Sequence, residues 1–276
     1  MDPAPFLLPR FQNPPLDEVA IGLLFDRLEG FTDLHAGLFW RSVKGEYPRS
    51  LSRPRVDEEA EVLSGSPLRR LVLPSFGILE PGDSIGIRTW LVSADDSLLL
   101  QIQDTHFLRN WRKRDSFEYP HHESFRAGFW DAYDRFLELL DEEAIERPKV
   151  RQVEISYFNW ITDDIDFFVP GQALRLSDPG LSSRPELLSW KSTFLDHVDG
   201  APVGRLWIEL QPGARKDARQ EDAVIGYRLS ITYRAPLDDP DRDRIDSAVS
   251  RGRELIDRTF LDVTSVEAQE RWGRIQ

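Results

Sequence analysis

Runs of alternating or continuous apolar residues predict seven β-strands along this chain. The first is the run 18–25, EVAIGLLF, which has the length of a strand and one fully apolar face. The others are 85–93, 98–103, 153–161, 191–197, 205–211 and 224–234. Residues Ala94 to Asp96 separate the second strand from the third and predict a hairpin. The pattern therefore predicts a mainly antiparallel sheet.

Apolar residues spaced three or four apart predict helices between these strands. Thr32 is the expected N-cap of a helix over 33–47, and Pro48 is expected to stop it. Residues 123–144 carry the widest apolar stripe, with acidic residues on the opposite side. The stripe consists of Phe125, Phe129, Tyr133, Phe136, Leu137 and Leu140. So broad a stripe needs a large apolar partner, which we expect to be the sheet.

Two further helices are predicted near the end of the chain. Asp239 is the expected cap of the first, with Pro240 at its first position. Its buried edge is expected to contain Ile245, Val249, Gly252, Ile256 and Phe260. A capping-box pattern at 264–267 then predicts a short helix that brings Trp272 toward the core.

The elements follow the same order twice: strand, cover segment, antiparallel strands, helix. We therefore predict an α+β fold, a mainly antiparallel sheet with long helices packed on one face and built from two pseudo-repeats. The halves would be 1–150 and 151–276, joined in one continuous structural unit. Residues 49–84, rich in Pro, Gly, Ser and charged residues, predict a long loop or irregular cover. A polar, proline-containing stretch to about Trp190 takes the same place in the second half.

Composition narrows the class of protein. A hydrophobic content of 40% with 8 Trp and 16 Phe is typical of a folded globular chain. The absence of cysteine excludes disulfides, thiolate metal sites and a cysteine nucleophile. No stretch approaches the ~20 apolar residues that span a bilayer, and the leader lacks the features of a secretory signal. We therefore expect a cytoplasmic protein with no membrane partner.

A net charge of −13 opposes non-specific nucleic-acid binding over most of the surface.

Several stretches together resemble a sporadically distributed family of uncharacterised prokaryotic proteins. They are PPLDEV, GLFWRSVKGEYP, RTWLVSADDSLLLQIQDTHFLRNWRKR with the nearby YP, VEISYFNWI and TFLDVTSVEAQERW. The resemblance spans most of the chain and implies a single structural unit. No activity, substrate or catalytic residue is established for the family, so the resemblance implies no mechanism. Its patchy occurrence is like that of accessory genes for defence or toxin–antitoxin systems.

The stretch 98–114 begins as a strand and is expected to end in a basic, aromatic turn. The turn comprises Arg109, Asn110, Trp111, Arg112, Lys113 and Arg114. Four cations around an indole fit a nucleic-acid or anion contact in which the ring stacks on a base. In the alternative interpretation Trp111 enters the core and the cations lie in water or pair with Asp104, Asp115 and Glu118. The flanking acids favour this structural interpretation.

A histidine pair is the candidate for a metal site. His121, His122 and Glu123 invite this interpretation, with His106 as a further ligand. Adjacent side chains at a helix start point in different directions, so polar helix-start residues are the better interpretation. No second cluster with metal-ligand spacing occurs in the sequence, and we predict neither a metal nor another cofactor.

Two other candidates have a weaker pattern. Ser84, with Asp196 and His197 as distant partners, resembles a hydrolase nucleophile, but a strand and not a helix is expected after it. Three acids follow the strand 153–161, in a loop that lacks the glycine and the final glutamate of a calcium site. They are Asp163, Asp164 and Asp166.

Three functional hypotheses remain. The leading one is a non-enzymatic binding or regulatory module that engages a protein partner in a prokaryotic defence or toxin–antitoxin system. It is based on the lack of a recognisable catalytic set and on the acidic charge, which suits a basic partner. The second is a nucleic-acid-binding protein that uses 109–114 and the cations Arg41, Lys44, Arg49, Arg53 and Arg55. The third is a small-molecule sensor or enzyme with a pocket between sheet and helices.

Overall fold

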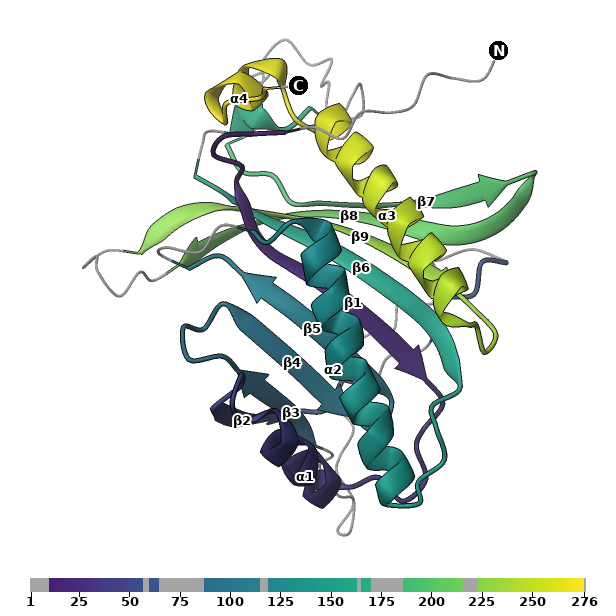
Figure 1. Cartoon of the computed structure of the whole chain (residues 1–276). Helices are drawn as coiled ribbons and strands as arrows, with labels where there is room; N and C mark the ends of the chain where they lie inside the picture. Colours follow the sequence, from purple (N-terminus) through teal and green to yellow (C-terminus); the bar gives the residue numbers. More distant parts are fainter. Residues whose placement is uncertain are drawn as a thin grey trace, which may run out of the picture.

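One nine-stranded antiparallel sheet organises the fold (Figure 1). The computed structural model describes residues 10–56, 60–64, 87–114, 119–162, 165–169, 186–215 and 223–275. Within them the strands lie in the order β2-β3-β4-β5-β1-β6-β9-β8-β7, and four α-helices accompany the sheet. The α+β class and the mainly antiparallel sheet are therefore confirmed.

The elements have the following bounds. The first five strands are β1 (Leu16–Phe25), β2 (Arg49–Pro54), β3 (Ile87–Val92), β4 (Leu98–Gln103) and β5 (His106–Arg112). The remaining four are β6 (Val150–Ile161), β7 (Trp190–Val198), β8 (Ala201–Arg215) and β9 (Val224–Pro236). The helices are α1 (Asp33–Val43), α2 (His122–Glu142), α3 (Arg242–Val263) and α4 (Val266–Arg271), with a 3-10 turn η2 (Ile165–Phe167). The prediction of long helices is not confirmed, since the α-helices span 11, 21, 22 and 6 residues.

Each of the seven predicted strands is present, but two further strands escaped prediction. β2 lies at an edge of the sheet with every residue exposed, so it has no hydrophobic pattern. It corrects the expectation of an irregular cover from residue 49. β5 contains most of the segment expected to be a basic turn, and only Asp104 and Thr105 separate it from β4. The alternation of apolar and polar residues in β5 was not recognised, because a cation occupies one of its core-facing positions.

Three helix ends differ from the sequence predictions. Helix α1 ends at Val43 and not at residue 47, and Gly45 follows directly in the turn. Asp239 does not cap α3, because its φ of +44° lies in the left-handed region and an N-cap needs extended backbone. The cap is Asp241, whose carboxylate accepts the N–H of Arg244 at 2.8 Å. The cap of α4 is Ser265, one residue after the first residue of the predicted capping box.

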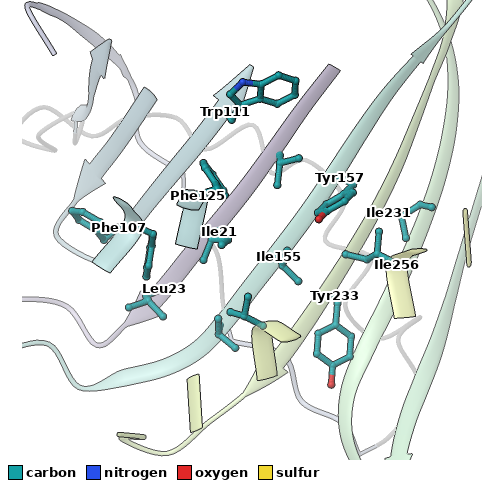
Figure 2. Packing of buried hydrophobic residues seen from close by; sticks show 14 of the residues in the cluster. Ile21, Leu23, Phe107, Trp111, Phe125, Ile155, Tyr157, Ile231, Tyr233 and Ile256 are labelled. Carbon is teal, nitrogen blue, oxygen red and sulfur yellow. The ribbon is translucent and has the colours of Figure 1, made fainter. Parts of the chain in front are cut away.

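The helices lie on one face of the sheet. Figure 1 shows α2 and α3 on the same side, and α3 contacts β6 and β9 while α2 contacts β5. Alternate residues of the strands point toward them, and Figure 2 shows Phe107 of β5, Ile21 of β1, Ile155 of β6 and Tyr233 of β9 in one cluster. The buried stripe predicted for α2 is confirmed, because Phe125, Phe129, Tyr133, Phe136 and Leu140 are all buried and Leu137 packs against them.

Strand β1 lies at the middle of the sheet and is buried on both sides. It pairs with β5 along one edge and with β6 along the other, so the sheet is continuous. Val19, Ile21 and Leu23 face the helices, whereas Ala20 and Leu24 are buried on the helix-free face. Two buried faces explain why the sequence 18–25 is almost wholly apolar. The division into halves at residue 150 stays a prediction.

A short segment, 60–64, lies on the helix-free face over the second half of the sheet. The N–H of Glu61 donates to Gln152 Oε1 at 2.7 Å. The Glu61 carboxylate accepts from Arg205 Nε at 3.0 Å and from Trp207 Nε1 at 2.8 Å. The ion pair between Arg205 and Glu61 is almost fully buried, and its hydrogen bonds offset the cost of removing both charges from water. None of the described helices has both the length and the apolar composition to cross a membrane.

Replacing Phe129 by Ala tests the burial of α2. We expect a loss of about 3–5 kcal/mol in the free energy of unfolding, because a fully buried aromatic side chain is removed. Urea denaturation measures it. Arg135→Ala, on the exposed side of the same helix, should change the same quantity by less than about 0.5 kcal/mol. Equal effects of the two substitutions would contradict the placement of the helix.

Candidate functional site

The basic segment 109–114 is a strand with its continuation, and its side chains alternate between the two faces of the sheet. The register pairs Arg109 with Ile21 and Trp111 with Val19, which places both on the helix side. Asn110 and Arg112 point to the other side. Trp111 is buried, as the structural interpretation predicted. The six residues therefore do not form one surface.

Arg109 is a buried cation that connects three elements. Its side chain is only 7% exposed. Nε donates to the hydroxyl of Tyr47 at 3.2 Å, and Nη1 donates to the carbonyl oxygen of Phe125 at 3.0 Å. The guanidinium also lies 5.1 Å from the centre of the Phe125 ring and 3.7 Å from the Glu46 carboxylate. These contacts join β5 to the start of α2 and to the residues after α1, which is a structural role.

The cations on the other side converge on one carboxylate. Asp96, in the β3–β4 hairpin, accepts from Arg112 at 2.9 Å and from Arg49 at 3.0 Å, and Arg114 lies 2.7 Å away. Partial burial opposes ionisation of Asp96, but the hydrogen bond from Arg114 and the other cations outweigh it and lower its pKa. Lys113 is the exposed member of the segment.

Of the three acids expected as partners of the basic segment, only Asp104 is described. Asp104 pairs with Arg27 and Arg55 instead, and Asp115 and Glu118 lie outside the described residues. The sequence offered no signal for Asp96, since a hairpin residue becomes a partner only when β3, β4 and β5 are side by side. Use of 109–114 for nucleic-acid or anion binding stays a prediction.

The histidine pair is split by the start of α2. His121 precedes the helix and is exposed, whereas His122 is buried, and neither of its ring nitrogens has a hydrogen-bond partner in the described chain. Burial, and then the charges of Arg253 and Arg126, lower the pKa of His122 to about 3. Glu123 points to solvent and pairs with Arg126. Across the described residues, no three His, Asp or Glu side chains are placed to hold a metal.

The other sequence candidates lie only partly within the described residues. Asp196 pairs with Arg251 and accepts from the hydroxyl of Tyr233 at 2.8 Å, so it anchors α3 to the sheet. Ser84, its suggested partner, falls outside the described residues, as do two of the three acids after β6. They are Asp163 and Asp164. The third, Asp166, is exposed in η2.

The structure contains a cavity of about 180 Å³ on the helix side, whose lining residues the sequence analysis did not name as a site. It lies where α3 crosses β6 and β9, and the chain before β1 closes one side; Figure 2 shows Tyr157, Ile231 and Ile256 in this region. Its lining is Phe11, Pro14, Leu16, Tyr119, Tyr157, Asn159, Ile231, Arg253, Ile256, Asp257 and Phe260. These residues come from distant parts of the sequence, so no local motif signals them.

Asp257 is the unusual group in this cavity. Burial raises the pKa of its carboxyl to about 7, and Arg253 opposes the shift only in part. The Nε of Arg253 lies 3.7 Å from the Asp257 carboxylate, which is longer than a hydrogen bond. Nε is buried and has no hydrogen-bond partner among the described residues. The cavity therefore contains a carboxyl group and a guanidinium that do not form a hydrogen bond with each other.

Two phenols extend the polar side of the cavity. The rings of Tyr119 and Tyr157 are 6.4 Å apart at their centres and meet edge to face. Burial raises the pKa of Tyr119 to about 12 and that of Tyr157 well above its ordinary value, so both are neutral at pH 7. The Tyr119 hydroxyl is buried without a hydrogen-bond partner in the described chain. Together these groups offer hydrogen bonds to a small molecule whose remaining surface is apolar.

The chain matches no protein-family model and no curated protein.

Replacing Arg109 by Ala separates its structural role from a binding role. We expect a loss of about 2–4 kcal/mol in the free energy of unfolding, because the hydroxyl of Tyr47 and the carbonyl of Phe125 lose a buried donor. Chemical denaturation measures the loss. Lys113→Ala removes an exposed cation from the same segment and should change stability by less than about 0.5 kcal/mol. An unchanged stability of the Arg109 variant would exclude the structural role.

Proposed function

We propose that the protein is a binding module for a small molecule, and that the cavity beneath α3 is its ligand site. The ligand class is a mainly apolar molecule with one group that donates hydrogen bonds, such as an amine or a hydroxyl. The observation that carries this proposal is the Asp257 carboxyl, which lines the cavity and accepts no hydrogen bond from any described residue.

The physical argument is one of unmet hydrogen bonds. The Asp257 side chain is only 17% exposed and has a single ion pair, at 3.7 Å, with Arg253. A ligand that donates to this carboxylate therefore adds a hydrogen bond that is partly shielded from water. Phe11, Leu16, Ile256 and Phe260 give the ligand an apolar surface to contact. Cavities on the order of 150 Å³ accommodate a benzene-sized molecule, so this one is large enough for a single ring with a short polar group.

Three ring compounds of similar size test the ligand class: benzylamine, benzyl alcohol and benzoate. We expect the amine and the alcohol to bind with dissociation constants on the order of 1 mM, and benzoate not to bind, because its carboxylate faces Asp257. The amine stays protonated, so its affinity should increase as pH rises through about 7 and Asp257 ionises. Calorimetric titration at pH 6 and pH 8 measures both effects.

Asp257→Asn should remove this pH dependence and weaken the binding of benzylamine by ~10-fold or more. Asp262→Asn makes the same exchange at an exposed position of α3 and should leave binding unchanged. If benzoate bound as tightly as benzylamine, or if the two variants behaved alike, the proposal would be wrong.

A protein partner is the second candidate function, and the edge strand β7 favours it. In the described part of the chain β7 pairs only with β8, so its outer edge offers backbone hydrogen bonds to another strand. Phe194, Leu195 and Val198 on this strand are exposed, at 54%, 39% and 39%. We propose an extended segment of a partner protein as the occupant. The net charge of −13 favours a basic segment.

Replacing Phe194 and Leu195 together by Glu tests this candidate. The wild-type chain should retain a stoichiometric partner in affinity capture from the native host, and the double variant should lose it. Ile225→Glu changes an exposed apolar residue of β9, away from the β7 edge, and should retain the partner. Failure to capture any stoichiometric protein, or equal capture by both variants, would refute this use of β7.

We also propose that the two halves are pseudo-repeats. In each half the first strand, β1 or β6, pairs with the last strand of an antiparallel series, β5 or β9, and a helix follows that last strand. The shared order supports the proposal, although the halves differ in strand number. The cytoplasmic location and the defence or toxin–antitoxin setting stay hypotheses from the sequence.

A further inference from the structure

A pair of arginines that forms no ion pair with any described carboxylate lies on the helix-free face, near the β2 edge of the sheet. Arg53 of β2 and Arg88 of β3 are directly opposite each other in the strand register. Their guanidinium carbons lie 4.9 and 5.5 Å from the centre of the Trp90 ring. Like charges directly opposite on neighbouring strands destabilise a sheet, so this arrangement has a cost that the fold itself does not explain.

Two nearby arginines have ion-pair partners among the described residues, but Arg53 and Arg88 do not. Arg49 pairs with Asp96, and Arg55 pairs with Asp104. No described carboxylate lies within ion-pair distance of Arg53 or Arg88. Burial, together with the charge of Arg53, lowers the pKa of Arg88. The indole face attracts both cations, but a neutral ring leaves their charge uncompensated.

Two donors on this face also lack hydrogen-bond partners among the described residues. They are Nε of Arg88 and Nε1 of Trp90, and both are buried. An anion with several acceptor oxygens would satisfy them and the two charges at once, because the planar guanidinium matches the geometry of phosphate oxygens.

The side-chain amide of Gln101 lies beside these donors, and its hydrogen bond to a neighbouring strand fixes its orientation. The side-chain amide of Asn110 donates to the Glu18 carboxylate, which leaves its oxygen to accept from Nε2 of Gln101 at 2.9 Å. Oε1 of Gln101 is then buried and accepts no hydrogen bond from a described residue, and Gln101 lies opposite Trp90 in the register. A ligand here therefore meets donors on one side and a single acceptor on the other.

We propose that Arg53, Arg88 and Trp90 bind the phosphate group of a small phosphorylated molecule, whose hydroxyl or amino group donates to Gln101. The site lies on the face opposite the cavity, so it does not depend on the function proposed for that cavity. A phosphate in a nucleic-acid backbone has the same chemistry. The net charge of −13 favours the small ligand, because a polyanion is repelled by most of the surface.

Adenosine 5′-monophosphate, inorganic phosphate and a short single-stranded DNA oligonucleotide are the three probes, measured by calorimetric titration at low salt. We expect the nucleotide to bind more tightly than inorganic phosphate, and the oligonucleotide no more tightly than the nucleotide. Arg53→Gln and Arg88→Gln should each weaken nucleotide binding by ~10-fold or more. Arg147→Gln removes an exposed arginine elsewhere and should leave binding unchanged.

Thermal unfolding without ligand distinguishes this site from a structural feature. Removing one of two facing cations should leave the melting temperature unchanged or raise it, whereas a fall in both variants would assign the pair a structural role and overturn the proposal. Nucleotide binding that is absent, or unchanged in both variants, would also overturn it. Binding of the oligonucleotide alone, lost in both variants, would assign the site to nucleic acid and overturn the small-ligand assignment.

Discussion

The fold depends on strand β1 pairing along both of its edges. β1 is the only connection between β5 and β6 in the sheet order, so the continuity of the sheet is decided by its ten residues. Seven of them in succession are buried, on the helix side and on the helix-free side alike. Gly22 is required here, since a Cβ at this position would lie 2.7 Å from Cγ of Leu108 on the neighbouring strand.

The two faces of the sheet differ in the kind of side chain that they bury. On the helix side, aromatic and aliphatic residues of α2 and α3 remove the apolar residues of the strands from water, which supplies most of the favourable free energy. On the helix-free side, buried polar groups satisfy one another, as Glu61, Arg205 and Trp207 do. Arg109 is the exception on the helix side, where a buried cation holds α2 against the strand. Its contacts explain why a basic residue belongs in this core.

Buried polar atoms without a hydrogen-bond partner in the described chain occur at both proposed sites, and also outside them, as at His122 and Ser192. Beneath α3, Asp257 and Arg253 are too far apart to form a hydrogen bond, and Tyr119 has no partner for its hydroxyl within the described chain. On the opposite face, Arg53 and Arg88 share one indole ring. At both places such groups lie beside charged side chains, and we therefore propose them as positions for ligands. This is the physical basis for treating the molecule as a binding module.

The elements with a strong hydrophobic period could be predicted from the order of their residues. The strand 18–25, the stripe of α2 and the alternation of β9 were all predictable, because one buried face imposes its period on the residues. The same reasoning did not predict β2, which has no buried face, or β5, where Arg109 occupies a core position. Two arrangements became visible only in the folded protein. The basic residues form ion pairs with Asp96, and Asp257 and Tyr157 line the same cavity. These contacts join residues far apart in the chain, and the pKa of Asp257 depends on burial that no local pattern encodes.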